Sequence, residues 1–341
     1  MGVVSKLAAL AGVCIVALAA AGPGAAQTPP KPIPTKPAVA KPTTPKQAID
    51  RKAAAAKSAT SPPRPDAVPS DGLKSDAPAK QLFGAKAAPA NLQARAIGFY
   101  ARGCLAGATA LPINGSTWQV MRLSRNRNWG HPKLISFLER LSGKMPQIAG
   151  WNGLLVGDLS QPRGGPMLTG HASHQVGLDA DIWLTPMPNR ELSREERETI
   201  SATMIVAADR RDVDPNVWTP GHVAAIRAAA QDPDVERVFV NAAIKKALCR
   251  DAGRDRGWLN KVRAYWGHDY HMHVRMRCPA GSTNCENQPK VGPEEGCGKD
   301  LDWWFRESIL RPKPATKPAK PKPPMQLGAL PSECRQVLLA P

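Results

Sequence analysis

Five of the seven histidines in this 341-residue chain lie in two short segments that also contain aspartates. The first, GHASHQVGLDADIW, spans residues 170–183, and the second, WGHDYHMHVR, spans residues 266–275. Imidazole nitrogens and carboxylate oxygens are donors that Zn²⁺ takes in a tetrahedral site, and a catalytic zinc keeps one coordination position open. Burying several such groups without a function costs desolvation free energy at each of them. The two segments therefore predict a zinc site.

The spacing within each segment shows how a fold can bring these side chains together. His174 and Asp181 flank the turn-like sequence QVGL, so a loop that enters a strand can return the carboxylate toward the imidazole. In a strand that begins at His271, the side chains of His271 and His273 point to the same face, because side chains alternate with a period of two. Two such segments side by side in a sheet can present three ligands and leave neighbouring histidines unligated.

Other polar residues receive supporting roles in this interpretation. We expect Asp179 to orient a ligand rather than to bind the metal. A lone histidine is more often a structural residue than a ligand, and this is the expectation for His222 and His131. His131 is also kept, together with His171, Gln175 and Asp179, as a candidate for an additional metal or substrate contact.

The N-terminal residues 1–26 have the pattern of a signal peptide, with Lys6 before an apolar stretch and small residues at the end. No other long apolar run exists, so no transmembrane segment is expected after signal cleavage. Six cysteines follow the leader, and an even number in an exported chain favours disulfides over a cysteine-bound metal. Proximity alone suggests only the pair Cys278 and Cys285.

The positive charge of the chain lies mainly in segments rich in proline and lysine. The formal net charge is +18, and residues 28–90 contain 11 basic against 4 acidic residues, while residues 311–324 contain 5 basic and no acidic residues. Such segments have few large apolar side chains to offset the entropy of ordering. Because the basicity is not that of a folded surface, we expect no nucleic-acid partner.

Five regions follow from this composition. They are the signal peptide 1–26, a disordered Pro/Ala/Lys-rich tether at 27–90, a folded domain at 91–310 that carries the predicted zinc site, a Lys/Pro-rich linker at 311–324 and a C-terminal segment at 325–341.

Apolar periodicity predicts a mixture of helices and strands in the folded region. Helices are expected at 131–143, 193–210, 220–231, 241–250 and 256–266, and strands at 117–123, 153–160, 178–184, 236–241 and 271–277. Their irregular alternation favours an α+β fold, with a central antiparallel sheet that carries the zinc site and helices that flank it.

Four segments in order resemble one known family. They are RNRNWGHP (125–132), GDLSQPRGG (157–165), TGHASHQVGLDADIW (169–183) and WGHDYHMHVRMRCP (266–279). They closely resemble the penicillin-insensitive murein endopeptidases, exported zinc peptidases of the fold group shared by lysostaphin, D-alanyl-D-alanine peptidases and the hedgehog signalling domain. The resemblance covers about residues 93–310 and reaches the terminal cysteine segment.

The resemblance implies a site and a set of disulfides. His174, Asp181 and His273 would bind zinc, and His271 would be catalytic and unligated. Some relatives in the fold group use a glutamate base near this strand, but this chain has none there, so His268 is the other candidate for the base. The compatible disulfides are Cys104–Cys334, Cys249–Cys297 and Cys278–Cys285.

The implied activity is hydrolysis of the D-alanyl to meso-diaminopimelyl amide in peptidoglycan cross-links, in the periplasm. A serine nucleophile is not expected, since the folded region contains no Ser-x-x-Lys motif. Two alternatives stay open: a zinc D,D-carboxypeptidase acting on uncross-linked stem peptides, and a non-catalytic wall-binding module that retains zinc. The oligomeric state does not follow from the sequence.

Overall fold

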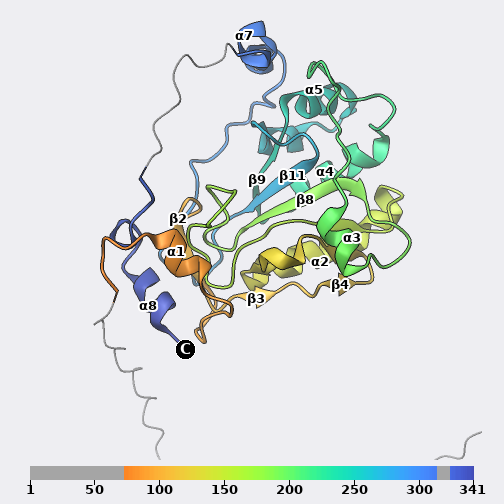
Figure 1. Ribbon diagram of the computed structural model, residues 1–341. Helices are drawn as coiled ribbons and strands as arrows, with labels where there is room; N and C mark the ends of the chain where they lie inside the picture. Colours follow the sequence, from red (N-terminus) through yellow and green to blue (C-terminus); the bar gives the residue numbers. More distant parts are fainter. Residues whose placement is uncertain (1–72, 313–322) are drawn as a thin grey trace, which may run out of the picture. The chain divides into compact units, whose positions relative to one another are not determined.

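The computed structural model describes residues 73–312 and 323–341 (Figure 1). The expected signal peptide, the tether up to residue 72 and residues 313–322 of the expected linker lie outside the described residues. Among the residues that are described, no helix has both the length and the apolar character needed to cross a membrane.

A seven-stranded sheet forms the centre of the folded unit. Its strand order is β10-β9-β11-β8-β7-β5-β4. The bounds are β10 Val262–Ala264, β9 Val235–Val240, β11 His271–Met276, β8 Asp179–Pro186, β7 Leu154–Val156, β5 Trp118–Val120 and β4 Asn114–Gly115. The central pairs β9/β11, β11/β8 and β8/β7 are antiparallel, whereas β10/β9 and β5/β7 are parallel. The sheet is therefore mixed, and the expected antiparallel pairing holds at its centre.

Two smaller sheets complete the β structure. One has the order β12-β1-β2, with β12 at Cys285–Glu286, β1 at Arg95–Phe99 and β2 at Arg102–Ala106. The other pairs β3 (Thr109–Ala110) with β6 (Trp129–Gly130). Most of these strands are only two residues long, so they leave no periodic signal in the sequence.

Three helices of ten residues or more accompany the central sheet: α2 Pro132–Ile148, α4 Pro220–Gln231 and α5 Ala242–Asp251. The longest of them, α2, begins with His131 as its N-cap and proline at its first position, a favourable start for a helix. Leu134, Leu138 and Leu141 recur at helical spacing and are buried in the main core. These three helices confirm the predictions for residues 131–143, 220–231 and 241–250.

Two predicted helices are wrong over much of their length. The capping box of Ser193 and Glu196 does start a helix, but α3 (Arg194–Thr199) ends after six residues. Beyond it, Ile205 and Val206 are buried in the main core, and Val206 forms an isolated β-bridge instead of a helical turn. The stretch 256–266 forms a short 3-10 helix at Gly257–Lys261 and then β10, because pairing with β9 outweighs local helical propensity.

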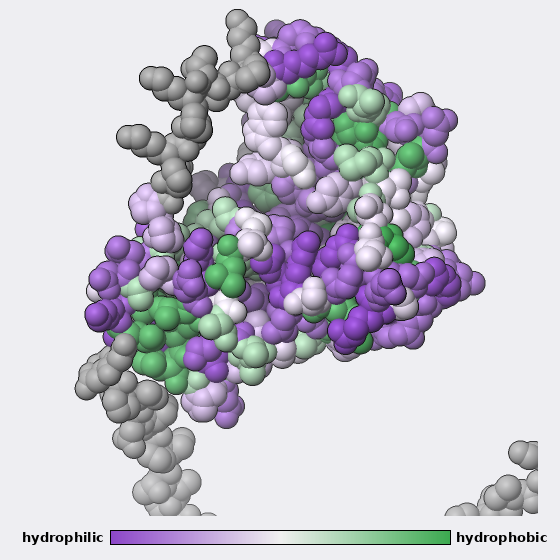
Figure 2. All heavy atoms as spheres, viewed as in Figure 1, coloured by the Kyte–Doolittle hydropathy of each residue, from purple (hydrophilic) through white to green (hydrophobic). Residues whose placement is uncertain are grey.

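The C-terminal part of the expected tether is also folded, which corrects the boundary at residue 90. Residues 79–84 form α1 (Ala79–Gly84), and Phe83 is fully buried. Phe83 packs in a second apolar core with Ile97 of β1 and with Val337 and Leu338 of α8 (Glu333–Leu339). Figure 2 shows a hydrophobic surface area in the region of α1 and α8, above this core. Val337 and Leu338 lie about 250 residues further along the chain than Phe83, so local composition could not reveal this packing.

The described residues form three disulfides, and their pairing is the one that the resemblance implied. They are Cys104–Cys334, Cys249–Cys297 and Cys278–Cys285. The first ties the C-terminal segment to β2, as expected. Arg163 reinforces the same junction, because its guanidinium donates to the carbonyl oxygens of Val337, Leu338 and Ala340.

Five short helical segments remain among the described residues: the helices α6 Lys299–Asp302 and α7 Glu307–Leu310, and the 3-10 turns Leu123–Arg125, Trp303–Phe305 and Leu327–Ala329.

Candidate metal centre and active site

The two predicted metal-binding segments are antiparallel neighbours in the central sheet. In the register of β8 and β11, Asp181 lies directly opposite His273, and Asp179 lies opposite Arg275. Facing residues on one side of a strand pair are close enough for their side chains to interact. The sheet thus brings together residues that are about 90 positions apart in the sequence.

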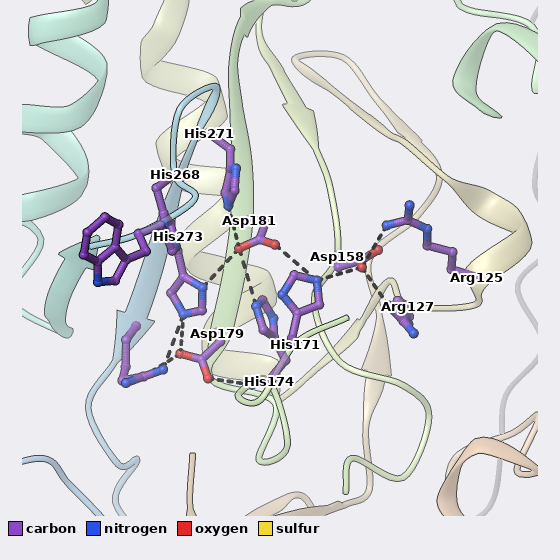
Figure 3. Close-up of polar contacts among 12 residues, drawn as sticks. Arg125, Arg127, Asp158, His171, His174, Asp179, Asp181, His268, His271 and His273 are labelled. Atoms are coloured by element: carbon purple, nitrogen blue, oxygen red, sulfur yellow. Dashed lines mark hydrogen bonds and ion pairs between the residues drawn. The ribbon is translucent and has the colours of Figure 1, made fainter. Parts of the chain in front are cut away.

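Asp181 is the centre of a cluster of four histidines (Figure 3). Its Oδ1 lies 3.1 Å from Nδ1 of His273, 3.4 Å from Nε2 of His174 and 3.6 Å from Nε2 of His271. Its Oδ2 lies 3.5 Å from Nε2 of His171. All of these side chains except His171 are buried.

Several polar atoms in this cluster are buried without a hydrogen-bond partner among the described residues. They are both ring nitrogens of His174, Oδ1 of Asp181 and Nδ1 of His271. Such orphaned atoms are rare in folded proteins because each costs desolvation free energy. Donor atoms of His171, His174 and Asp181 all lie within 4.8 Å of one another, and this group could hold a metal ion. The donor set of nitrogen and carboxylate oxygen fits zinc.

Asp179 fixes the positions of two members of the cluster. Its Oδ2 accepts the backbone N–H of His174 at 3.0 Å, and its Oδ1 accepts Nε2–H of His273 at 3.0 Å and Nε–H of Arg275 at 2.7 Å. His174 has a φ of 66°, a left-handed conformation that a non-glycine residue adopts only when its surroundings enforce it. Burial alone would raise the pKa of Asp179, but the charges of Arg275 and His273 outweigh it and hold that pKa well below its usual range.

Gln175 and His131, the remaining candidates for a supporting or additional contact, are not among the side chains that surround Asp181. Gln175 is buried in the loop that precedes β8. Its Oε1 accepts Gly103 N–H and its Nε2 donates to Ala101 O, so it holds this loop against β2 and the residue before it. The ring of His131 accepts the backbone N–H of Lys133 at the start of α2.

His222 is structural, as expected. It is buried, and its Nε2 lies 3.0 Å from the carbonyl oxygen of Leu184.

His268 lies next to His271 of the cluster, and the ring centroids of these two histidines are 4.8 Å apart. Nδ1 of His268 lies 2.6 Å from the carbonyl oxygen of Trp266, which can only accept, so this nitrogen carries the proton and Nε2 is free to accept one. Burial and the neighbouring His271 and His273 lower the pKa of His268 to about 4. Burial also lowers the pKa of His271, against the opposing effect of Asp181. Both rings are therefore neutral near pH 7.

Sequence reasoning missed one acidic residue of the site. Asp158 follows β7, and its Oδ2 accepts hydrogen bonds from His171 Nε2 at 2.9 Å, Arg125 Nη1 at 3.0 Å and Arg127 Nη1 at 2.9 Å. Burial raises the pKa of Asp158, but the hydrogen bond from His171 and the charges of Arg125 and Arg127 outweigh it and lower the pKa to about 2. Asp158 could have been found because it lies in GDLSQPRGG, at residues 157–165, one of the four segments that carry the family resemblance.

Comparison with known proteins decides the family. Residues 96–339 match the sequence profile of the penicillin-insensitive murein endopeptidases. The chain belongs to this family.

Named members of the family are similar to the chain over most of its length. A penicillin-insensitive murein endopeptidase of Haemophilus influenzae is 47% identical over 253 residues, which cover 73% of this chain and 84% of the relative. Those of Salmonella heidelberg and Escherichia coli are 46% and 45% identical over 246 residues, covering 72% of this chain and 86% of each relative. Membership of the murein endopeptidases makes the chain a peptidase, as the resemblance implied.

Two cavities with shared lining residues flank the candidate metal centre of this murein endopeptidase, and together they are called the cleft, each cavity being one half. One cavity, of about 360 Å³, is lined by Tyr100, Phe239, Tyr265, His268 and His273 among others. A second, of about 370 Å³, is lined by Arg122, Arg125, Asp158, Trp183 and Met204 among others. His171, Tyr270 and His271 line both. The first half is mainly aromatic and contains one arginine, Arg275, which is paired with Asp179, whereas the second half carries Arg122 and Arg125.

Proposed function

We propose that this chain is a zinc metallo-endopeptidase that hydrolyses the D-alanyl to meso-diaminopimelyl amide in peptidoglycan cross-links, with no serine nucleophile. His174, Asp181 and His273 would hold the zinc. The observation that carries the proposal is the set of buried, unpartnered ring and carboxylate atoms around Asp181. A coordinated cation would satisfy Oδ1 of Asp181 and Nε2 of His174, the ring nitrogen nearest to it, and would remove the desolvation cost of these two atoms.

Two histidines compete for the third ligand position, and their hydrogen bonds separate them. His273 directs Nδ1 toward Asp181, while its Nε2–H is donated to Asp179. A metal-binding histidine ordinarily donates its other ring N–H to a carboxylate in this way. His171 instead uses Nε2, the nitrogen nearest Asp181, to donate to Asp158. We therefore assign His273 as the ligand and His171 to a supporting position.

When bound, zinc supplies a Lewis acid that polarises a carbonyl group and lowers the pKa of water. The chain's own contribution is to accept and return a proton. His271 lines both halves of the cleft, and its neutral ring suits proton acceptance near pH 7. His268 offers Nε2 as an acceptor beside it, because its Nδ1–H is donated to Trp266. Either ring can then pass the proton to the leaving amine.

The two-sided cleft favours an endopeptidase over a carboxypeptidase. A substrate chain can continue on both sides of His271, whereas removal of a terminal residue needs little room on one side. A non-catalytic wall-binding module would need only the zinc ligands. The buried His271, which we leave unligated beside them, therefore argues against this alternative.

We place the protein in the periplasm with peptidoglycan as its partner, exported by residues 1–26. The three disulfides support this location, because disulfides persist in oxidising compartments.

Mass spectrometry of muropeptides tests the proposed function. Purified mature protein, stripped of metal and then reloaded with zinc, should convert isolated cross-linked dimers into monomers, and the stripped protein should not. Uncross-linked pentapeptides should stay intact. Release of terminal D-alanine from pentapeptides with intact dimers would instead establish the carboxypeptidase alternative.

A further inference from the structure

Three arginines lie in or beside the second half of the cleft, and among them Arg125 is the most exposed and makes the fewest hydrogen bonds. Arg122 donates to the carbonyl oxygens of Arg197 and Ile200. Arg127 donates to Thr169 as well as to Asp158, and only 10% of its side chain is exposed. Arg125 is different, because 47% of its side chain is exposed and, within the described residues, its one polar contact is with Asp158. Most of its five N–H donors therefore face solvent in the cleft.

The backbone around Arg125 holds this side chain in place. Arg125 ends a short 3-10 turn, Leu123–Arg125, between two non-glycine residues with left-handed φ angles, 57° at Arg122 and 51° at Asn126. Ser124 anchors the turn through two hydrogen bonds to the carboxylate of Glu198. Strained residues of this kind persist only where the surrounding structure enforces them, and they gather at functional sites.

Asp158 connects Arg125 to the reaction centre. Arg125 and His171 donate to the same oxygen of Asp158, and the same nitrogen of His171 lies 3.5 Å from Asp181. Figure 3 shows Arg125 and Arg127 on the side of Asp181 opposite to His268 and His273. The single charge of Asp158 does not by itself neutralise both of the arginines that it binds.

The bond in the proposed function has a carboxylate beside it. The amide nitrogen is attached to a carbon of the diaminopimelyl residue that also carries a free carboxylate, so this anion lies one carbon away from the scissile amide. A guanidinium group binds a carboxylate through two parallel hydrogen bonds. We infer that Arg125 is a specificity-determining residue that binds this diaminopimelyl carboxylate, an inference that rests on the proposed function. The leaving-amine side of the substrate then occupies the arginine half, and the D-alanyl methyl group lies in the aromatic half beside Tyr100 and Phe239.

Three soluble dimers test this inference with the full mature protein loaded with zinc. In the first dimer, the glutamyl carboxylate and the diaminopimelyl carboxylate beside the scissile amide are both free. In the second, only this diaminopimelyl carboxylate is converted to a primary amide. In the third, only the glutamyl carboxylate is converted. The wild type should prefer the first dimer to the second by about 10- to 100-fold in kcat/KM, the range expected for a charge-assisted hydrogen bond. It should cleave the first and third equally.

The variants assign that preference to one side chain. Arg125→Gln should cleave the first and second dimers at similar rates and keep its full zinc content, and Arg125→Lys should keep part of the preference. Arg140→Gln, which removes an exposed arginine of α2, should keep all of it. An equal loss on both dimers in Arg125→Gln would show that Arg125 acts only through Asp158, and would overturn the inference.

Two further outcomes would also overturn it: wild-type cleavage of the first two dimers at equal rates, or a preference that follows the glutamyl carboxylate. A wild type that cleaves no dimer would refute the proposed function itself, and this inference with it.

Discussion

His273 lies directly opposite Asp181 in the pairing of β11 with β8, and its Nδ1 is 3.1 Å from Oδ1 of that carboxylate. Register in a sheet is set by the burial of alternate side chains, so a shift by one residue would turn His273 away from Asp181. Met272 and Val274 alternate along β11 with His271, His273 and Arg275, and both are fully buried. The candidate metal centre therefore depends on the same hydrophobic pattern that builds the core.

The first prediction separates the ligands from the proton acceptor. His174→Ala, Asp181→Ala and His273→Ala should each lose bound zinc and activity together, because each change removes a donor from the coordination sphere. His271→Ala should keep most of its zinc and lose turnover. Metal analysis of the purified variants measures this directly.

The same measurement distinguishes the two possible third ligands. If His273 is the ligand, His171→Ala retains more zinc than His273→Ala. The reverse order would show that the group of His171, His174 and Asp181 binds the metal. Full zinc retention in Asp181→Ala would refute both assignments.

The second prediction concerns Asp179, which contacts two proposed ligands without binding zinc itself. Asp179→Asn keeps the shape of the side chain but removes the charge that faces His273 and Arg275. We expect zinc affinity to fall by about 10- to 100-fold, the usual effect of losing a carboxylate that orients a histidine ligand. Excess zinc should restore turnover.

Competition with a chelator measures the affinity of the Asp179 variant. Asp255→Asn, at an exposed carboxylate, is the matched control and should have no effect. If excess zinc failed to restore activity in Asp179→Asn, Asp179 would have a role beyond orienting the ligands.

Much of the site was predictable because its residues form short sequence patterns. The spacing of His174 and Asp181 and the alternation at His271 and His273 predicted the convergence that the sheet produces. Asp158 escaped this reasoning, since a lone aspartate after a three-residue strand has no pattern of its own. Its role depends on contacts with Arg125 and His171, which fold toward it from other loops.

Secondary structure was predictable where the apolar periodicity extends over a long segment, as in α2. It was not predictable where contacts with distant residues determine the local structure. Residues 256–266 have helical spacing, but parallel pairing with β9 draws Val262 into a strand. Phe83 looks isolated in a proline-rich segment, and its partners Val337 and Leu338 lie at the other end of the chain. Local propensity is a weak guide in such cases.

The third prediction follows from the corrected tether boundary. Deleting residues 28–72 should leave the melting temperature unchanged, whereas deleting 28–90 should lower it, because the longer deletion removes Ala79 and Phe83 from the second core. Phe83→Ala alone should cost about 3–5 kcal/mol of unfolding free energy, the usual value for a buried phenylalanine. Gln81→Ala, at an exposed site on the same helix, should cost little. Equal stability of the two deletion variants would contradict the packing of α1.

The fourth prediction concerns the charge of the tether on an insoluble substrate. Residues 28–72 are rich in lysine and contain few large apolar residues, so their removal should leave turnover on soluble muropeptides unchanged. Digestion of intact sacculi should slow, because a cationic segment raises the concentration of enzyme near an anionic wall. Salt screens this attraction, so the advantage of the full-length protein should shrink as ionic strength rises. Equal digestion of sacculi at low salt would leave the segment as a spacer.

The last prediction concerns a buried lysine that is remote from the proposed chemistry. Lys245 of α5 is 1% exposed, and its Nζ donates to the carbonyl oxygens of Leu259 at 2.8 Å and Glu295 at 2.5 Å. Burial, with a smaller effect from the charge of Arg263, lowers the pKa of Lys245 from 10.5 to about 7. The unfolded chain therefore binds more protons than the folded chain between these two pH values.

The free energy of unfolding should consequently rise with pH above about 7, with Lys245 contributing a slope of up to about 1.4 kcal/mol per pH unit. Lys245→Met keeps most of the apolar stem and cannot titrate, so its stability should rise less steeply. Denaturant unfolding of both proteins with their disulfides intact, at several pH values from 6 to 9, measures the two slopes. The difference in slope is the decisive quantity, because the variant also loses two hydrogen bonds and its absolute stability changes at every pH. Parallel curves for the two proteins would mean that Lys245 stays protonated in the folded state across this range.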